Sequence, residues 1–463
     1  MRAADPEGTH SLRPSKGRIG SPIHPENSVR SRIASCRGRS AGSSSARRGV
    51  ALFEASAPAE DIARQEVRDD GRDPVKEPRL QPLAEVRDLV ALGVPLPFRV
   101  LDAAGRLLLS SGNKLVGDRQ FAALLERGAW VEREAADLVR RERCEADGGA
   151  TPRLMSTAHR TATLFDRWEP QLWALDALLR QAQKQVAQGE HLAAMVDDVG
   201  VLVDRDPDVA LFHVVRHEER RFALYALSHA LHSAVVLRLV GRTLGWDEVR
   251  LRSGMGAALT MNLAIVELQA TMAEQKEPPT RKQLDSIRTH PERGATLLAG
   301  CGIADTDWLA AVREHHEQED GKGYPRGLSQ LCDAAVLLRA VDVYTAKISP
   351  RAFRAALTPQ VAARQLYQAQ PASPVTAALV KTLGVYPPGE LVLLKSGETG
   401  VVTRRATAEH GLMVAALTDR QGKSVVSTHQ RDTAEPAFGI TAAAHRETIA
   451  RVLPERVYGV ITW

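Results

Sequence analysis

The chain has 463 residues, of which 44% are hydrophobic and 25% charged, and its formal net charge is +5. This is ordinary globular composition, and the length predicts roughly two to four domains. No stretch approaches about 18 uninterrupted apolar residues, which excludes a membrane-spanning helix. Four widely spaced cysteines without a CxxC pair exclude a disulfide framework and a cysteine zinc site, so we expect a cytoplasmic protein with no membrane partner.

The positive charge is concentrated at the N-terminus. Residues 1–50 hold ten Arg and Lys against three Asp and Glu, together with ten serines and almost no apolar periodicity. We therefore predict that residues 1–81 form a disordered basic, Ser-rich tail and linker. Its acid-poor composition also fits an organelle transit peptide, the less favoured alternative. Because the remaining residues sum to a slightly negative charge, we expect no nucleic-acid partner.

Residues 82–150 predict a small α+β module. The segment PFRVLDAAGRLLLSSG predicts two short strands around a turn at Ala104-Gly105. GDRQFAALLERG then predicts a helix, and WVERE a closing strand. No catalytic cluster is recognisable in this module.

Residues 155–375 predict a helical domain, because apolar residues recur there at spacings of three and four. In THPERGATLL, Thr289 is predicted to cap a helix and Pro291 to lie in its first turn. Asp307 is predicted to cap DWLAAVREHHE, and a further helix carries AAVLLRAVDVYTAK. The fold class expected is mainly α, an all-helical bundle flanked by two small modules.

The pattern changes again at Pro387-Pro388-Gly389. ELVLLKSGETGVVTRR and LMVAALTDRQGKSVVST each predict a strand, a turn and a second strand. Residues 385–440 therefore predict a small β-barrel-like module, and residues 441–463 a C-terminal tail.

The chemistry is expected in the helical domain, where two adjacent histidines, His315 and His316, stand out. Neighbouring residues on a helix point about 100° apart, so at a helix end both can line one cleft and bind different metals. Together with Asp342 on a later helix, these ligands suit Fe, Mn or Zn. A single helical histidine is more often a surface or core residue, so the interpretation depends on the loop that follows.

That loop, EHHEQEDGKGYPRGL, resembles the signature HHExxDGxGYPxGL of the HD-GYP family, with ten matching positions from His315 to Leu328. Four flanking segments resemble family motifs in the right order: HSAVV, HPERG, DVYTA and RAFRAAL. PPGELVLLKSGETGVV resembles the small β-module that often follows this domain. The resemblance covers about residues 215–370.

The resemblance implies a helical bundle that hydrolyses the bacterial second messenger cyclic di-GMP with two or three metals, typically iron or manganese. The positions that match metal ligands are His232, His290, His315, His316 and Asp342. The positions that match ligand-binding residues are Asp320, Gly321, Gly323, Tyr324, Pro325, Arg351 and Arg354. For the two arginines this implies contact with phosphates, for which a guanidinium is well shaped. The implied partners are cyclic di-GMP, a diguanylate cyclase or another signalling protein, and a second copy of the chain.

The sequence departs from the family at its defining motif. Where the family has HD in a segment like LLHDIGK, this chain has GAALTMNLAIVEL, which places Thr260 and Met261 at the His and Asp positions. The soft, uncharged thioether of Met261 cannot bridge two hard cations as a carboxylate does. Thr345 also replaces the second Asp of the family's DVYDA segment. We therefore expect iron or manganese at reduced occupancy or not at all.

Three hypotheses follow. The favoured one is a catalytically impaired pseudo-enzyme that binds cyclic di-GMP or a partner protein. The second is an active metal-dependent phosphodiesterase with a rearranged site, in which Glu267, two helical turns beyond Thr260, substitutes as a ligand. The third is an interaction scaffold that uses no nucleotide; it would keep its partner after loss of Arg351 and Arg354.

Overall fold

The structure is a computed structural model that describes residues 79–115, 117–146, 163–216, 221–444 and 454–459. Almost all of the predicted tail (1–81) and much of the predicted C-terminal tail (441–463) lie outside these ranges.

The first module is a four-stranded antiparallel sheet with two helices. Its strands, in the order β1-β4-β2-β3, are β1 (Leu80–Pro82), β4 (Trp130–Glu132), β2 (Val100–Leu101) and β3 (Leu107–Leu109). The predicted strands β2, β3 and β4 and the predicted helix α1 (Asp118–Glu126) are confirmed. The turn between β2 and β3 places Gly105 at a φ of 77°, where a residue without a Cβ is favoured. The sequence did not predict β1, the 3-10 helix η1 (Leu83–Leu89) or α2 (Arg133–Ala146).

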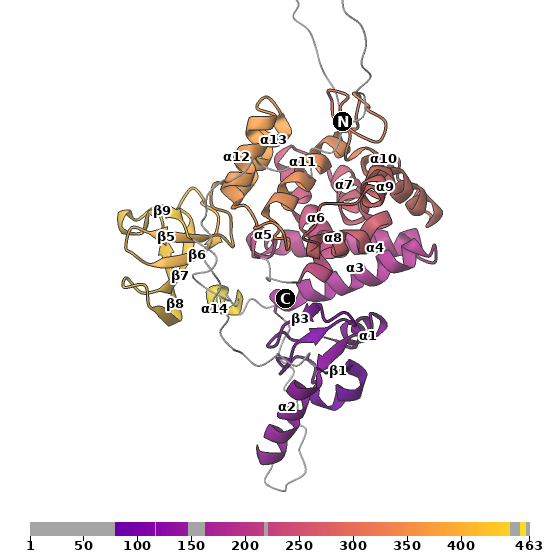
Figure 1. Ribbon diagram of the computed structural model, residues 1–463. Helices are drawn as coiled ribbons and strands as arrows, with labels where there is room; N and C mark the ends of the chain where they lie inside the picture. The colour runs from indigo at the N-terminus through magenta and orange to yellow at the C-terminus, as the bar shows by residue number, and fades with distance from the viewer. Residues whose placement is uncertain (1–78, 116, 147–162, 217–220, 445–453, 460–463) are drawn as a thin grey trace, which may run out of the picture. The chain divides into compact units, whose positions relative to one another are not determined.

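The second region is a bundle of helices, which confirms the mainly α fold class (Figure 1). Its first helices are α3 (Trp168–Gln183), α4 (Gly189–Arg205), α5 (Pro207–Val215), α6 (Tyr225–Thr243), α7 (Glu248–Thr260) and α8 (Val266–Glu274). They are followed by α9 (Arg281–Gly300), α10 (Thr306–Glu314), α11 (Asp333–Ile348), α12 (Pro359–Ala369) and α13 (Pro374–Leu383). Short 3-10 turns are η2 (Phe165–Arg167), η3 (Phe222–Leu224) and η4 (Leu263–Ile265).

Helix α6 is the core helix of this bundle. With η3 it forms a segment, Phe222–Thr243, that is long and apolar enough to cross a membrane by length and composition, and 89% of that window is buried inside the protein. It also carries buried polar side chains, among them His229 and Arg238. Burial by neighbouring helices explains its apolar composition, since a helix that is apolar on all sides is expected at the centre of a bundle.

Two predicted helix starts are wrong. Helix α9 is capped nine residues before Thr289, by a capping box in which Thr280 and Gln283 exchange hydrogen bonds, so Pro291 lies inside the helix. Helix α10 is capped by Asp305, whose carboxylate accepts from two backbone N–H groups, and not by Asp307. In both cases a better cap upstream satisfies the free N–H groups of the first turn, and the helix extends back to it.

The last module is a five-stranded antiparallel sheet in the order β8-β7-β6-β5-β9. The predicted strands are confirmed as β5 (Leu391–Leu394), β6 (Thr399–Arg404), β7 (Met413–Thr418) and β8 (Ser424–Asp432). Strand β9 (Ile440–Ala443), which pairs with β5, was not predicted. A 3-10 turn η5 (Pro436–Phe438) precedes β9, and a short helix α14 (Pro454–Tyr458) follows.

Candidate metal centre

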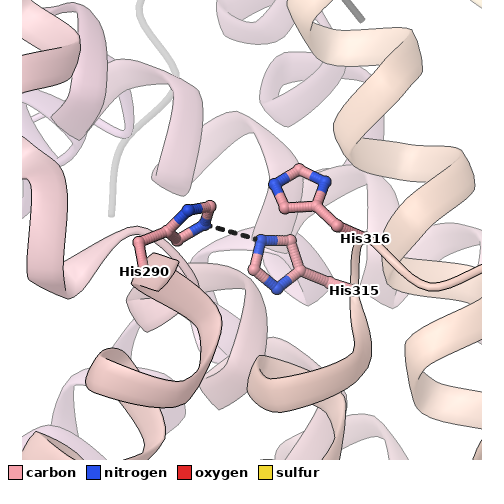
Figure 2. A group of neighbouring side chains, drawn as sticks. All are labelled: His290, His315 and His316. Carbon is pink, nitrogen blue, oxygen red and sulfur yellow. Dashed lines mark hydrogen bonds between the residues drawn. The ribbon is translucent and has the colours of Figure 1, made fainter. Parts of the chain in front are cut away.

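Three buried histidines converge in the helical bundle (Figure 2). His290 lies in α9, whereas His315 and His316 directly follow the end of α10. One ring nitrogen of each lies within 4.8 Å of the other two. The three residues are 1%, 1% and 7% exposed. The structure thus brings together three of the five residues that match family metal ligands.

Backbone carbonyls fix the orientation of two of these rings. The Nδ1 atoms of His290 and His315 lie 2.5 Å from Ile287 O and 2.7 Å from Val312 O. A carbonyl oxygen only accepts, so each Nδ1 carries a proton and each Nε2 of a neutral ring keeps its lone pair. These two Nε2 atoms lie 3.1 Å apart, along the dashed line in Figure 2. Two facing lone pairs repel each other, and a cation placed between them would relieve that repulsion.

Pro291 makes the carbonyl of Ile287 available to His290. Inside a helix, the N–H of residue 291 would bond to the carbonyl of residue 287, but proline has no N–H. The Nδ1–H of His290 occupies that carbonyl instead. The proline therefore helps to fix the tautomer of His290, a candidate ligand. This effect depends on the position of Pro291 inside the helix, and not in its first turn as predicted.

Burial keeps these imidazoles neutral. It lowers the pKa of His290 to about 3, with the neighbouring His315 adding to the effect. Burial likewise lowers the pKa of His315, and that of His316 well below the ordinary value. The Nδ1 atom of His316 is also buried without a hydrogen-bond partner in the described residues. Neutral rings with unused lone pairs are the form in which histidine binds metals, so the three residues fit a metal ion.

Asp342, the carboxylate that matches a family ligand, is engaged by another histidine. The Nε2 atom of His229 in α6 lies 2.8 Å from Asp342 Oδ1, and its Nδ1 atom lies 3.4 Å from the hydroxyl of Thr345. Burial alone would raise the pKa of Asp342, but the hydrogen bond and charge of His229 outweigh it, and the pKa is lowered. The carboxylate is therefore held as an anion by a partner from α6.

His232 lies three residues after His229 on the same helix but is not part of the three-histidine group among the described residues. The ring charges that act on it are those of His229 and His213, and burial lowers its pKa to about 3. The sequence motif HSAVV pointed to His232, whereas the structure places His229 beside Asp342. The two histidines lie about one helical turn apart on the same side of α6, so the sequence alone does not show which of them meets Asp342.

The two residues at the lost HD positions close the end of α7 without offering a ligand. The Thr260 hydroxyl donates to Gly256 O at 2.7 Å and accepts from Trp308 Nε1 at 2.8 Å. Met261 is fully buried, and the next residue in the chain, Asn262, is also buried. Thr260 thus helps to pack α7 against α10. The only group that Met261 could offer to a metal ion is its thioether.

The loop after His316 is held by Glu317, which is fully buried. Its two carboxylate oxygens accept from the backbone N–H groups of Arg326 at 2.7 Å and Leu328 at 3.0 Å. Gly323 lies so close to the start of this loop that a Cβ on residue 323 would overlap the backbone of Glu317 and Gln318. The glycine and the buried carboxylate together fix the loop against the histidines.

The predicted ligand-binding residues of this loop take different positions. Tyr324 stacks on the ring of His316, with centroids 4.6 Å apart, and burial raises the pKa of its hydroxyl. The Tyr324-Pro325 bond is cis, and Gly321 has a φ of 71°. Asp320 turns toward Lys322, whose Nζ lies 2.8 Å away. Of this set, the described contacts place Tyr324 directly against the histidine cluster.

Arg351 and Arg354, predicted to contact phosphates, make hydrogen bonds within the protein. Arg351 donates to the Tyr225 hydroxyl at 3.2 and 2.7 Å, and Tyr225 stacks on His229 with centroids 5.7 Å apart. Arg354 donates to Ala346 O at 2.5 Å. Arg351 is therefore connected to His229 through Tyr225, and both guanidinium groups help to hold the segment after α11.

Two residues at the site were missed by the sequence reasoning, and one alternative ligand is placed elsewhere. The first is His229, and the second is Arg339 in α11, which no sequence motif indicated and whose Nη1 lies 3.5 Å from His316 O. The carboxylate of Glu267, considered as a substitute ligand, pairs with Arg180 at 3.2 Å and is 56% exposed. It belongs to no cluster of metal-binding side chains in the described part of the chain.

Comparison with known proteins finds relatives of the helical domain. The family described as "HD domain" matches residues 211–371, which include all the helices that carry the site. Cyclic di-GMP phosphodiesterase PA4108 of Pseudomonas aeruginosa is 28% identical over 234 residues, covering 50% of this chain and 56% of that protein. The response regulator RpfG of Xanthomonas campestris, also named a cyclic di-GMP phosphodiesterase, is 29% identical over 136 residues. That match covers 28% of this chain and 36% of RpfG.

The chain spans about half the length, or less, of these curated relatives. Among solved structures, Bd1817, a HDG"Y"P protein from Bdellovibrio bacteriovorus, matches with 14% identity and a TM-score of 0.43 over 66% of this chain and 99% of that chain. The family match shows that residues 211–371 of the chain are an HD domain, and the GYP loop and the curated relatives assign this domain to the HD-GYP type.

Proposed function

We propose that the chain binds cyclic di-GMP through its HD domain and hydrolyses it slowly or not at all. The relatives support the ligand, because the curated proteins it resembles are named cyclic di-GMP phosphodiesterases. The impairment rests on one observation: the end of α7 presents the committed hydroxyl of Thr260 and the thioether of Met261 where the family has a histidine and a bridging aspartate.

The retained residues fit one metal ion better than two. His290, His315 and His316 would hold iron or manganese through neutral ring nitrogens. A bound ion supplies positive charge that polarises a phosphoryl oxygen. Asp342 is paired with His229. A second metal ion would lack both the histidine and the bridging aspartate that the family has at the positions of Thr260 and Met261. Two metal ions together stabilise both the attacking and the leaving oxygen, which a single ion cannot do. We therefore expect the chain to retain binding of cyclic di-GMP but to lose most of its hydrolysis.

The proposal is tested by isothermal calorimetry of cyclic di-GMP into the full chain with manganese present. We expect a saturating isotherm without the sustained power offset that turnover produces. His315→Gln should weaken binding, whereas His410→Gln should not, because His410 is exposed and pairs with Asp432 of the C-terminal β-module. Absence of binding by folded protein would contradict the ligand, and a sustained offset would contradict the impairment.

A partner role is proposed beside the ligand. A diguanylate cyclase or another signalling protein, and a second copy of the chain, fit the signalling context of the relatives named above. Co-purification of a defined cyclase with the full chain, and the molar mass of the free protein by light scattering, test the two separately.

A further inference from the structure

Arg339 directs a guanidinium to the three-histidine site. It lies one helical turn before Asp342 on α11, and residues three apart share a helix face. Its Nη1 atom lies 3.5 Å from the backbone oxygen of His316. Its charge acts on the site from α11: it contributes to the lowered pKa values of His315, His316 and Asp342, and it opposes the rise that burial causes in the pKa of Tyr324.

Most hydrogen-bond donors of this guanidinium are uncommitted within the described residues. A guanidinium offers five N–H donors, and Arg339 makes one long hydrogen bond, to His316 O. No described carboxylate lies within ion-pairing distance of it, in contrast to Arg313 and Arg326 nearby, which pair with Glu292. The side chain is half-buried, and burial lowers its pKa. A partly desolvated cation with free donors is favourable only when an anion approaches it.

Three other cations named above, Arg351, Arg354 and Lys322, make their hydrogen bonds to groups outside the histidine segment. Arg351 donates to the hydroxyl of Tyr225, and Arg354 to the carbonyl of Ala346. Lys322 pairs with Asp320 on the loop surface. Among these side chains, Arg339 combines direct contact with the histidine segment and unused donors.

We propose that Arg339 is the phosphate-binding cation of this site and supplies, as a fixed guanidinium, part of the positive charge that a second metal would bring. Its ligand class is a phosphate monoester or diester, because paired, coplanar N–H donors match two phosphoryl oxygens. The inference rests on the proposed function for the identity of the nucleotide, but not for phosphate binding itself. It adds a residue that neither the GYP motif nor the predicted arginines include.

The test uses inorganic phosphate as the probe. Equilibrium dialysis of labelled phosphate against the full chain would be run with manganese and, separately, with a chelator. Loss of a charge-assisted hydrogen bond predicts that Arg339→Gln binds phosphate about tenfold or more weakly in both conditions. Arg339→Lys should retain part of the affinity, because charge stays while the paired geometry is lost.

A matched control is Arg252→Gln, which removes the same charge from α7, where the guanidinium pairs with Asp197. It should leave phosphate affinity unchanged. The inference is overturned if the wild-type chain binds no phosphate, or if Arg339→Gln binds it as the wild type does while folded by circular dichroism. If Arg339-dependent phosphate binding is found but cyclic di-GMP does not bind, the proposed function fails and this inference stands.

Discussion

Thr260 illustrates how one residue at a former ligand position can serve packing. Its hydroxyl is the acceptor for the buried indole N–H of Trp308. Thr260→Val leaves that N–H without a partner, which predicts a loss of about 1–3 kcal/mol in the free energy of unfolding. Urea unfolding measures this loss, and metal analysis should show unchanged content.

The control for Thr260 is Thr271→Val. The Thr271 hydroxyl donates to a carbonyl of its own helix at an exposed position, so its loss should change the free energy of unfolding by less than about 0.5 kcal/mol. A drop in bound metal in Thr260→Val would instead show that the residue belongs to the metal site.

The low pKa of His290 in the folded state predicts how the stability of the metal-free protein depends on pH. Its pKa is about 3 when folded and near 6.5 in the unfolded chain, so below pH 6.5 the unfolded state binds more protons. Stability from this residue is therefore complete above about pH 6.5 and is lost as pH falls. We expect a loss of about 2–3 kcal/mol from His290 between pH 7 and pH 4.5.

Urea unfolding at the two pH values, with a chelator present, measures this loss. His290→Gln should show a correspondingly smaller difference, because glutamine does not titrate. Equal pH dependence in the two proteins would mean that His290 is not buried neutral in the folded state.

At the scale of single residues, the sequence predicted the three-histidine cluster because the GYP motif fixes two members and the HPERG segment the third. It missed His229 because His229 and His232 are one helical turn apart, and apolar periodicity does not show which faces α11. It missed Arg339 because an arginine on a helix is usually solvated, and only the contact with His316 O reveals otherwise.

The loop from His315 to Leu328 depends on one glycine for its close packing. A Cβ at Gly323 would overlap the backbone of Glu317 and Gln318, which no side-chain rotation can relieve. Gly323→Ala is expected to cost about 3 kcal/mol or more, or to displace the loop from His316. Thermal unfolding and metal content measure the two effects.

Gly300→Ala is the matched control for that loop variant. A Cβ at Gly300 meets only ordinary contacts with Gln185, and alanine favours a helix, so stability should be unchanged or slightly higher. If Gly323→Ala unfolds like the wild type and keeps its metal content, the loop is not packed as described.

At the scale of elements, helix existence was predicted more reliably than helix starts. The apolar period identified the core of α9 and α10, but Thr289 and Asp307 compete with Thr280 and Asp305 as caps, and sequence spacing favours neither. Sequence reasoning favours the first turn for Pro291, because proline inside a helix costs free energy. The carbonyl that it frees is used by His290, and that compensation is visible only in three dimensions.

At the scale of the whole molecule, the order of an α+β module, a helical domain and a β-module followed from the change of period along the chain. Strands β1 and β9 were missed because their partners are far away in sequence: Leu80 pairs with Glu132, and Val392 with Ala443. Such long-range pairing leaves little local pattern in a strand of three or four residues.

The proposal that the chain binds cyclic di-GMP but hydrolyses it slowly or not at all has one most direct test. That test is to measure cyclic di-GMP turnover by the full chain with manganese or iron. The Pseudomonas aeruginosa relative PA4108, assayed under the same conditions, provides the reference. Loss of the bridging ligand and of the two-metal clamp predicts a rate lower by about 100-fold or more. A rate within about tenfold of the reference would contradict the impairment and would mean that Thr260 and Met261 do not disable the site.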